Sequence, residues 1–295
     1  MSDTLANLRR KIDGAVKLES VVRTMKAVAA SSIGQYEAAV HALADYERSV
    51  QLGLSVCFRQ SGFAPLISRS RSSAKIAGAI VFGSDQGLVG QFNETMADFV
   101  QKTLGAVPGD KKVWAVGERI YGRLADAGLA MAGQFAVPSS VNAITSLVGQ
   151  LQIAVEAQES GCATIDVFYT KLASGAQYEP VNQRLLPLDA QWQKDLIKIR
   201  WPTKILPELC GSQEITLRAF IREYLFISLF KACAESLASE NASRLAAMQR
   251  AEKNIDSLMT DLNRTFYRLR QSSIDEELFD VIAGFNALSH KERKA

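Results

Sequence analysis

The sequence predicts an α/β domain inserted between two long helices, which pair side by side in opposite directions as a coiled coil. The first observation is a run of 71 residues, Gln213 to Ala283, without a single Gly or Pro. As one helix it would be about 105 Å long, whereas a globule of 295 residues is only roughly 50 Å across. The second observation is a set of short β-branched runs, separated by Gly and Pro, in the middle of the chain. The long helix must therefore project beyond the compact part.

The amino-terminal segment, residues 4–56, carries apolar side chains that recur mostly every three or four residues. They are Leu5, Leu8, Ile12, Ala15, Val22, Met25, Ala29, Ile33, Tyr36, Val40, Leu43, Tyr46 and Val50. This spacing places them on one face of a single long helix. We assign residues 1–67 to this first helix of the coiled coil.

The middle of the chain, residues 68–211, alternates strand and helix patterns. Strands are predicted at Ile76–Phe82, Val113–Val116 and Thr164–Tyr169, and helices near Phe92–Leu104, Gly117–Ala127 and Val141–Glu159. The Ser- and Arg-rich segment Ser68–Ala74 is a predicted entering linker, and Trp201–Gly211 a predicted exit loop. Such alternation is typical of a Rossmann-like α/β layer domain.

The carboxyl-terminal segment, residues 212–295, repeats the helical pattern. Its apolar seam comprises Leu217, Ile221, Tyr224, Leu245, Met248, Ile255, Met259, Leu262, Phe266 and Leu269. A seam sustained over this length indicates supercoiling against a second helix, and the amino-terminal helix is its natural partner. In antiparallel pairing, residue 4 would lie opposite residue 265 or so, which leaves about 30 Å of the last helix unpaired.

That unpaired tip is apolar on more than one face. Its apolar residues are Tyr267, Leu269, Ile274, Leu278, Phe279, Val281, Ile282, Phe285 and Leu288. A helix that is apolar nearly all round is normally buried, and no other segment of the chain remains to bury this one. We therefore expect Ile274, Leu278, Ile282, Phe285 and Leu288 to bind inside a partner protein.

Composition excludes several classes of protein. With 47% hydrophobic and 22% charged residues the chain is globular material, and a net charge of +3 without a basic patch disfavours nucleic acid. The four cysteines lack the spacing of a metal site, and the two histidines lie far from any acidic cluster. The amino terminus lacks the apolar core of a signal peptide, and no run approaches 18 apolar residues, so membrane association is expected only through partners.

The segment GSDQGLVGQFN, Gly83–Asn93, follows a predicted strand and opens a helix, as a phosphate-binding loop would. Its glycines fit neither G-x-x-x-x-G-K-[ST] nor G-x-G-x-x-G, and it has no Lys. We predict a tight structural turn that Ser84 and Asp85 shape or cap. Since neither histidine lies near a nucleophile, we expect no catalytic residue, no metal and no cofactor in this chain.

Three segments carry a resemblance to a known family: Leu8–Ser32 (LRRKIDGAVKLESVVRTMKAVAASS), the loop SDQGLVGQFN, and the carboxyl-terminal ESLASENASRLAAMQRAEKN with RQSSIDEELFDVIAGFNAL. They resemble the gamma subunit of rotary F-type ATP synthases. The resemblance implies a central shaft whose end helices lie inside a ring of three alpha and three beta subunits. It also implies that the α/β domain sits at the foot, with the epsilon subunit on the c-ring, at the cytoplasmic face of the bacterial plasma membrane.

By the same resemblance, Met25, Lys26, Arg270, Gln271 and Asp275 are expected to contact the beta subunits. Arg270 is the strongest candidate, because a guanidinium can bind a partner carboxylate through two hydrogen bonds.

The chain departs from the family pattern at four places. Gln86 replaces a basic residue, Val89 a Cys, Ser32 a Lys and Asp275 a Thr. These departures indicate a divergent bacterial branch of the family. They also leave open that the chain belongs to a second, alternative ATPase complex of its host.

Two other interpretations fit the same helices. A static coiled-coil tether or scaffold would need a fixed, complementary docking surface at the tip, whereas a shaft needs a bearing that tolerates turning. A small enzyme on the α/β domain would require ligand binding by the middle segment, which calorimetry with nucleotides would detect.

Overall fold

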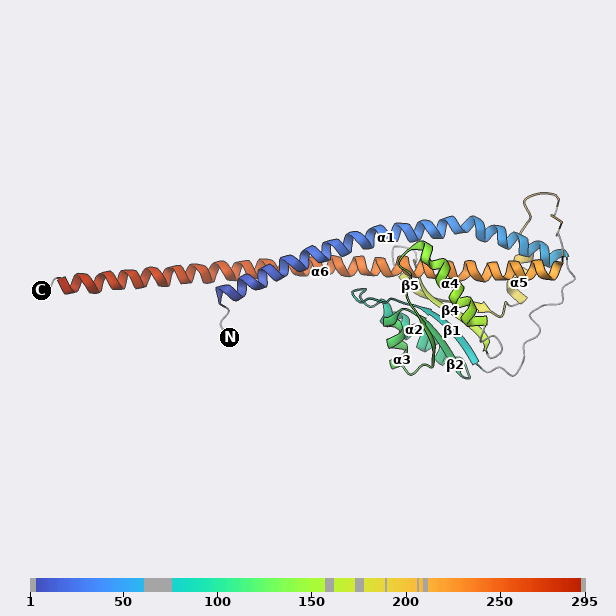
Figure 1. Cartoon of the computed structure of the whole chain (residues 1–295), viewed down its shortest axis with the longest axis horizontal. Helices are drawn as coiled ribbons and strands as arrows, with labels where there is room; N and C mark the ends of the chain where they lie inside the picture. The colour runs from blue at the N-terminus through green and yellow to red at the C-terminus, as the bar shows by residue number, and fades with distance from the viewer. Residues whose placement is uncertain are drawn as a thin grey trace. The chain divides into compact units, whose positions relative to one another are not determined.

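The computed structural model describes residues 4–60, 76–156, 162–172, 178–188, 190–205, 207–208 and 212–292. In chain order its elements are α1 (Leu5–Gln60), β1 (Ile76–Phe82), α2 (Phe92–Gly105), β2 (Lys111–Val116), α3 (Glu118–Asp126), β3 (Met131–Phe135), α4 (Val141–Glu156), β4 (Cys162–Leu172), β5 (Tyr178–Leu186), α5 (Ala190–Lys198) and α6 (Gln213–Glu292) (Figure 1). They form two packing units. One combines Met1–Val28 with Ala246–Ala295, and the other comprises Ala29–Leu245.

The larger unit is built on a five-stranded sheet with the strand order β3-β2-β1-β4-β5. The first four strands in this order pair in parallel, and β5 pairs antiparallel to β4. A parallel strand covered on both faces needs a nearly continuous apolar sequence. The central strand β1, IAGAIVF, meets this requirement, and six of its seven residues are buried.

Helices cover both faces of this sheet (Figure 1). On one face, α2 and α3 pack against Ala79, Val81 and Phe168. On the other face, α4 and the first half of α6 pack against Ile80, Phe82 and further strand residues. The connections between parallel strands run through helices, as an α/β layer fold requires.

The part of α6 that lies on the sheet is rich in small residues. Ala232, Ala234 and Ala238 are buried there, so the helix backbone can approach the strands closely. The side chain of Ser239 confirms the close approach, since its Oγ donates to the backbone oxygen of Thr170 in β4 at 3.0 Å. The sheet therefore completes its core with α6. The predicted domain boundaries at residues 67 and 211 stay a prediction. The two packing units instead divide each end helix, at Val28 and at Leu245.

A second apolar cluster joins α1, α5 and α6 within the same unit. Phe58 of α1 meets the edge of the Trp192 ring of α5 at 5.9 Å between centroids, and Trp192 lies 5.0 Å from the ring of Tyr224 in α6. Such ring pairs add to the stabilisation from apolar burial. This cluster fixes the last turns of α1 against the first turns of α6.

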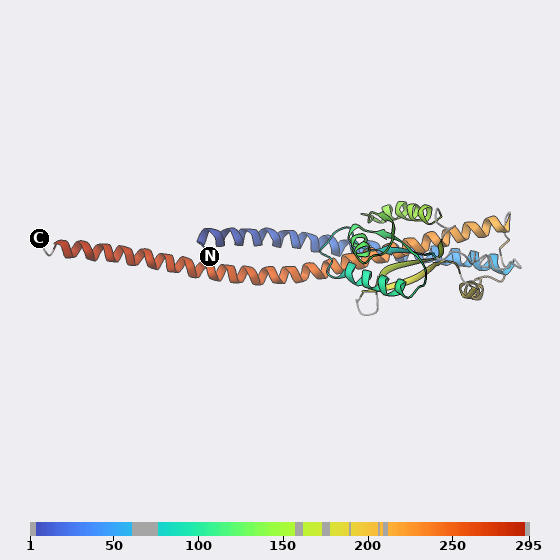
Figure 2. The same cartoon turned by 90° about the horizontal axis from the view of Figure 1, so that it is seen from below.

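The smaller unit is a pair of helices, the first half of α1 and the second half of α6. Leu8, Ala15 and Val22 are buried at intervals of seven residues, which is the repeat of a left-handed coiled coil. In Figures 1 and 2, α1 begins beside the middle of α6, and α6 continues past it. Every residue from 274 to 284 is exposed.

Most predicted elements are confirmed. The predicted strand Ile76–Phe82 matches β1, and both end helices are continuous from Leu5 and Gln213. Three elements were not predicted: β3, β5 and α5. The predicted linker Ser68–Ala74 and part of the exit loop lie outside the described residues. No described helix is long and apolar enough to cross a membrane.

Candidate partner-binding site

Ion pairs join the two helices close to the first predicted contact residues. Lys26 Nζ lies 2.6 Å from Glu252 Oε2, and Arg23 Nε lies 3.4 Å from Glu252 Oε1. The hydrogen bond from Lys26, with the charges of both bases, lowers the pKa of Glu252 below its ordinary value. Lys26, predicted to contact a beta subunit, is therefore already engaged within the chain.

Met25 belongs to an apolar stripe that the sequence analysis missed. Leu18, Val21 and Val28 are exposed on the same helix, and Met25 is half-buried. The four residues follow one another at spacings of three, four and three, so they form a second face beside the buried seam. This spacing is visible in the sequence and is the signal from which the stripe could have been predicted. We call these four residues the α1 stripe.

Arg270, Gln271 and Asp275 are all exposed on α6. Gln271 Nε2 donates to Asp275 Oδ1 at 3.1 Å, one helical turn along. Arg270 has no ion-pair partner among the residues that the structure describes. Its charge is thus available to a carboxylate on another protein.

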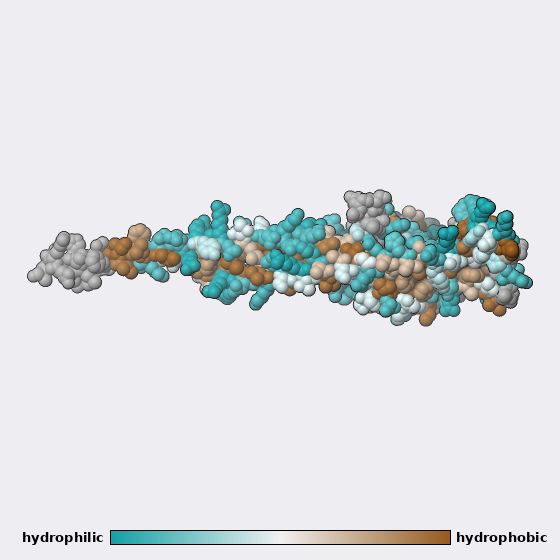
Figure 3. Space-filling model, turned by 90° about the horizontal axis from the view of Figure 1, so that it is seen from above, coloured by the Kyte–Doolittle hydropathy of each residue, from teal (hydrophilic) through white to brown (hydrophobic). Residues whose placement is uncertain are grey.

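The predicted tip residues Ile274, Leu278 and Ile282 are 48%, 56% and 46% exposed. Their neighbours Phe279 and Val281 are more exposed still, so the apolar surface extends round the helix. Figure 3 shows it as a brown area beside the grey end of α6. The side chains of Phe285 and Leu288 lie outside the described residues. We call the exposed residues 274–282 of α6 the tip.

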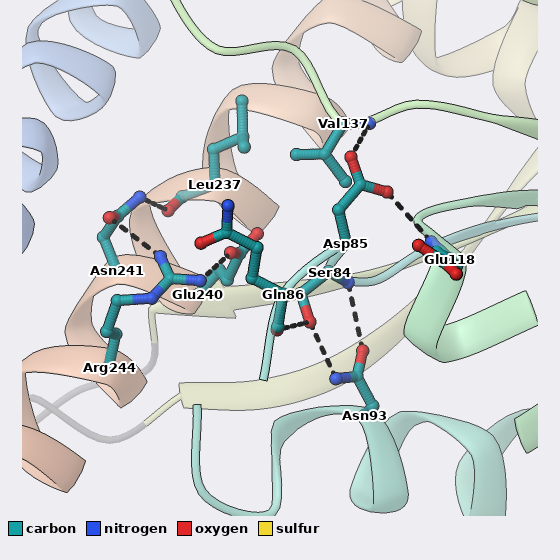
Figure 4. Close-up of polar contacts among 10 residues, drawn as sticks. All are labelled: Ser84, Asp85, Gln86, Asn93, Glu118, Val137, Leu237, Glu240, Asn241 and Arg244. Atoms are coloured by element: carbon teal, nitrogen blue, oxygen red, sulfur yellow. Dashed lines mark hydrogen bonds and ion pairs between the residues drawn. The ribbon is translucent and has the colours of Figure 1, made fainter. Parts of the chain in front are cut away.

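The loop between β1 and α2 is held by its own side chains (Figure 4). Asn93 Oδ1 accepts from the backbone nitrogen of Ser84 at 3.0 Å, and Asn93 Nδ2 donates to Ser84 Oγ at 2.8 Å. Asp85 accepts from two backbone nitrogens, Glu118 and Val137, each at 2.9 Å. The prediction that Ser84 and Asp85 shape a structural turn is confirmed.

This arrangement bears on the enzyme interpretation. The nitrogen of Glu118 lies at the start of α3, and the start of a helix can bind an anion. Here the carboxylate of Asp85 accepts the hydrogen bond from that nitrogen and offsets the positive end of the helix dipole. Among the described residues, no three His, Cys, Asp or Glu side chains are grouped so as to hold a metal ion.

Comparison with known proteins agrees with this architecture. The family model described as ATP synthase matches residues 4–288. A protein of Janthinobacterium sp. strain Marseille named ATP synthase gamma chain is 28% identical over 289 residues, which cover 95% of this chain and 98% of that one. The ATP synthase gamma chain of Frankia casuarinae is 27% identical over 98% of this chain and 99% of its own length.

Solved structures share the fold. One chain in the OSCP/F1/c-ring part of the Euglena gracilis mitochondrial ATP synthase covers 99% of this chain, and 96% of its own length, with a TM-score of 0.69 at 16% identity. A rotor chain of the same ATP synthase gives a TM-score of 0.62 over 92% of this chain and 98% of its own, also at 16% identity. The chain therefore belongs to the ATP synthase family, and both relatives described above are named ATP synthase gamma chain.

Proposed function

We propose that this chain is the central rotor shaft of an F-type ATP synthase. It couples ion flow through the membrane sector to ATP synthesis or hydrolysis in a ring of three alpha and three beta subunits, and it has no catalytic site of its own. The observation that carries this proposal is the exposed apolar tip of α6, which no described part of the chain covers. A sleeve formed by the ring would bury it.

The shaft acts through contacts that differ between the three beta subunits. A rotor can shift the equilibrium between open and closed nucleotide sites only by binding the two forms with different free energies. In this chain the α1 stripe lies on one helix, and Arg270, Gln271 and Asp275 lie on the other. A beta subunit facing the stripe therefore meets apolar side chains, whereas one facing Arg270 meets a positive charge.

We place the α/β domain at the foot, with the epsilon subunit and the c-ring, on the cytoplasmic face of a bacterial plasma membrane. The finding that no described helix can span a membrane supports a peripheral position. The sequence departures at Gln86, Val89, Ser32 and Asp275 support a divergent bacterial complex.

The first test measures the subunit composition of the complex that contains this chain. The chain is purified by affinity tag from its host, and the masses and amounts of the co-purified proteins are measured. We expect alpha and beta subunits in threefold molar excess over this chain. An equimolar set of other proteins would contradict the shaft.

The second test distinguishes a shaft from a static tether. Cysteines at Arg270 and on the facing beta loop, in a background without native cysteines, are joined by an oxidant in the assembled complex. If the chain is a rotating shaft, this disulfide should stop ATP hydrolysis, and reduction of the disulfide should restore the hydrolysis. A tether would tolerate the bond and keep full activity.

The enzyme alternative is tested by calorimetry with nucleotides on the full chain, since the sheet needs α6 to complete its core. We expect no binding, because the loop Gly83–Asn93 has neither the glycine pattern nor the Lys of a phosphate-binding loop.

A further inference from the structure

One short segment of the larger unit, α5 with the loop that follows it, carries the excess positive charge of the chain. Residues 190–205 contain four bases and one acid, so their net charge of +3 equals that of all 295 residues. The rest of the chain therefore holds as many acids as bases. All four bases are exposed: they are Lys194, Lys198, Arg200 and Lys204. The sequence analysis expected no basic patch, and this cluster corrects that expectation.

The same segment exposes apolar side chains. Ile205 is 82% exposed, which is the largest value among the large apolar residues that the structure describes. Ile197, on α5 between two of the lysines, is also exposed, and Trp201 is half-buried. Bases beside exposed aliphatic and aromatic side chains are typical of protein surfaces that contact the interfacial layer of a membrane.

The segment is held in place by the end of α1. Arg59 donates from Nε to the backbone oxygen of Ile197 at 3.1 Å and from Nη2 to that of Ile199 at 2.5 Å. These oxygens lie at the carboxyl end of α5, where a cation is favoured by the helix dipole. Arg59 is itself exposed, so it adds a fifth cation beside the four bases.

The loop after α5 is closed by its own side chains. Trp201 Nε1 donates to Thr203 Oγ1 at 2.9 Å, and Thr203 Oγ1 donates to the backbone oxygen of Ile205 at 2.8 Å. The two hydrogen bonds connect Trp201 to Ile205, so the aromatic ring and the exposed aliphatic side chain belong to one compact loop. Within the described part of the chain, Lys198 is the one base of the four with an ion-pair partner, Asp195 at 2.7 Å.

We propose that α5 and residues 199–205 form a docking surface for an anionic lipid bilayer. The bases bind headgroup phosphates, while Ile205 and Trp201 enter the interfacial layer. A purely polar polyanion would satisfy the bases but leave Ile205 in water. The sequence analysis expected membrane association only through partners, and this surface adds a direct, peripheral contact. The proposal does not depend on the shaft function, which the subunit composition tests separately.

The test is binding of the purified full chain to protein-free vesicles, measured by flotation in a density gradient. One set of vesicles is phosphatidylcholine alone, and the other contains about 30% phosphatidylglycerol, which is anionic. We expect binding to the anionic set only. Raising the salt from about 0.1 M to about 0.5 M shortens the screening length from about 10 Å to about 4 Å, and should weaken binding on the order of tenfold.

Two outcomes of this experiment would overturn the proposal. Absence of binding to anionic vesicles would assign the bases to a protein partner. Equal binding to neutral vesicles would assign the contact to the apolar tip, which carries Asp275, Glu276, Glu277 and Asp280 and gains nothing from anionic lipid.

Removal of three lysines tests the charge. Each base near an anionic surface strengthens binding about fivefold, so the triple variant should bind on the order of 100-fold more weakly. The substitutions are Lys194→Gln, Lys198→Gln and Lys204→Gln. Because all three side chains are exposed, the fold should be unaffected.

The matched control removes the same charge from exposed lysines elsewhere in the chain. It combines Lys17→Gln, Lys102→Gln and Lys253→Gln. This variant should bind anionic vesicles as wild type does. Equal losses in the two triple variants would show that only the total charge matters, and the docking surface would be wrong.

A second pair of variants tests the apolar part. Ile205→Ser should weaken binding several-fold, because the side chain no longer enters the interfacial layer. Ile153→Ser is the control, since Ile153 is 67% exposed on α4, outside the proposed surface. It should bind as wild type does. Unchanged binding of Ile205→Ser would show a general attraction to polyanions and would overturn the bilayer as the partner.

Discussion

At the scale of single residues, Arg270 is an exposed cation without an ion-pair partner among the described residues. We expect Arg270→Ala to change the free energy of unfolding by no more than about 0.5 kcal/mol, as for an ordinary surface site. If its guanidinium binds a carboxylate of a beta subunit, the variant loses a charged hydrogen bond in the complex. The number of ions pumped per ATP hydrolysed, measured in reconstituted vesicles, should therefore fall.

Arg268→Ala is the control for this prediction. Arg268 is also exposed on α6. It lies two residues from Arg270, which places it about 200° away around the helix. It should leave coupling unchanged. Equal losses in both variants would mean that any positive charge on this part of α6 suffices, and unchanged coupling in Arg270→Ala would remove the residue from the contact.

The sequence predicted the turn residues better than their partners. Ser84 and Asp85 belong to residue types that favour turns, so their role was visible locally. The acceptor role of Asp85 toward Glu118 and Val137 was not, because these lie 33 and 52 residues further along.

At the scale of elements, the turn from β2 into α3 depends on Gly117. Its φ is 118°, and a Cβ there would lie 2.8 Å from backbone atoms of Ser84. We expect Gly117→Ala to lower the free energy of unfolding by about 2 kcal/mol or more. Chemical denaturation of the purified chain, followed by tryptophan fluorescence, measures this.

Gly122→Ala is the matched control on the same helix. Gly122 lies inside α3 with open space around its Cα. Since Ala favours the helical backbone over Gly by about 1 kcal/mol, this variant should be neutral or more stable. Similar destabilisation by both substitutions would refute the close approach at Gly117.

Elements with strong local patterns were predicted, and those defined by pairing were not. The strand β1 is a continuous apolar run. By contrast, β3 has the sequence MAGQF, without a β-branched residue, and is a strand because it pairs with β2. The strand β5 contains Pro180 and several polar residues, and it forms at the antiparallel edge against β4. Edge strands tolerate such sequences.

At the scale of the whole molecule, the apolar seams predicted the helix pair and its uncovered end because a repeat of seven residues persists over many turns. The difference in length between the two end helices located the tip, because the carboxyl-terminal helix extends beyond the start of the amino-terminal one. The α1 stripe was not predicted, because apolar residues outside a seam are also common on ordinary protein surfaces.

The tip leads to a last prediction, for a chain that ends before Ile274. Burying side chains of this size yields about 1.5 to 3 kcal/mol each. The free full-length chain should therefore self-associate with rising concentration, and the shortened chain should remain monomeric in sedimentation velocity. Because the shortened chain keeps the α1 stripe and Arg270, a shaft should still co-purify with alpha and beta subunits, with weakened coupling. A tether docked only through the tip would lose them entirely, so co-purification decides between the two.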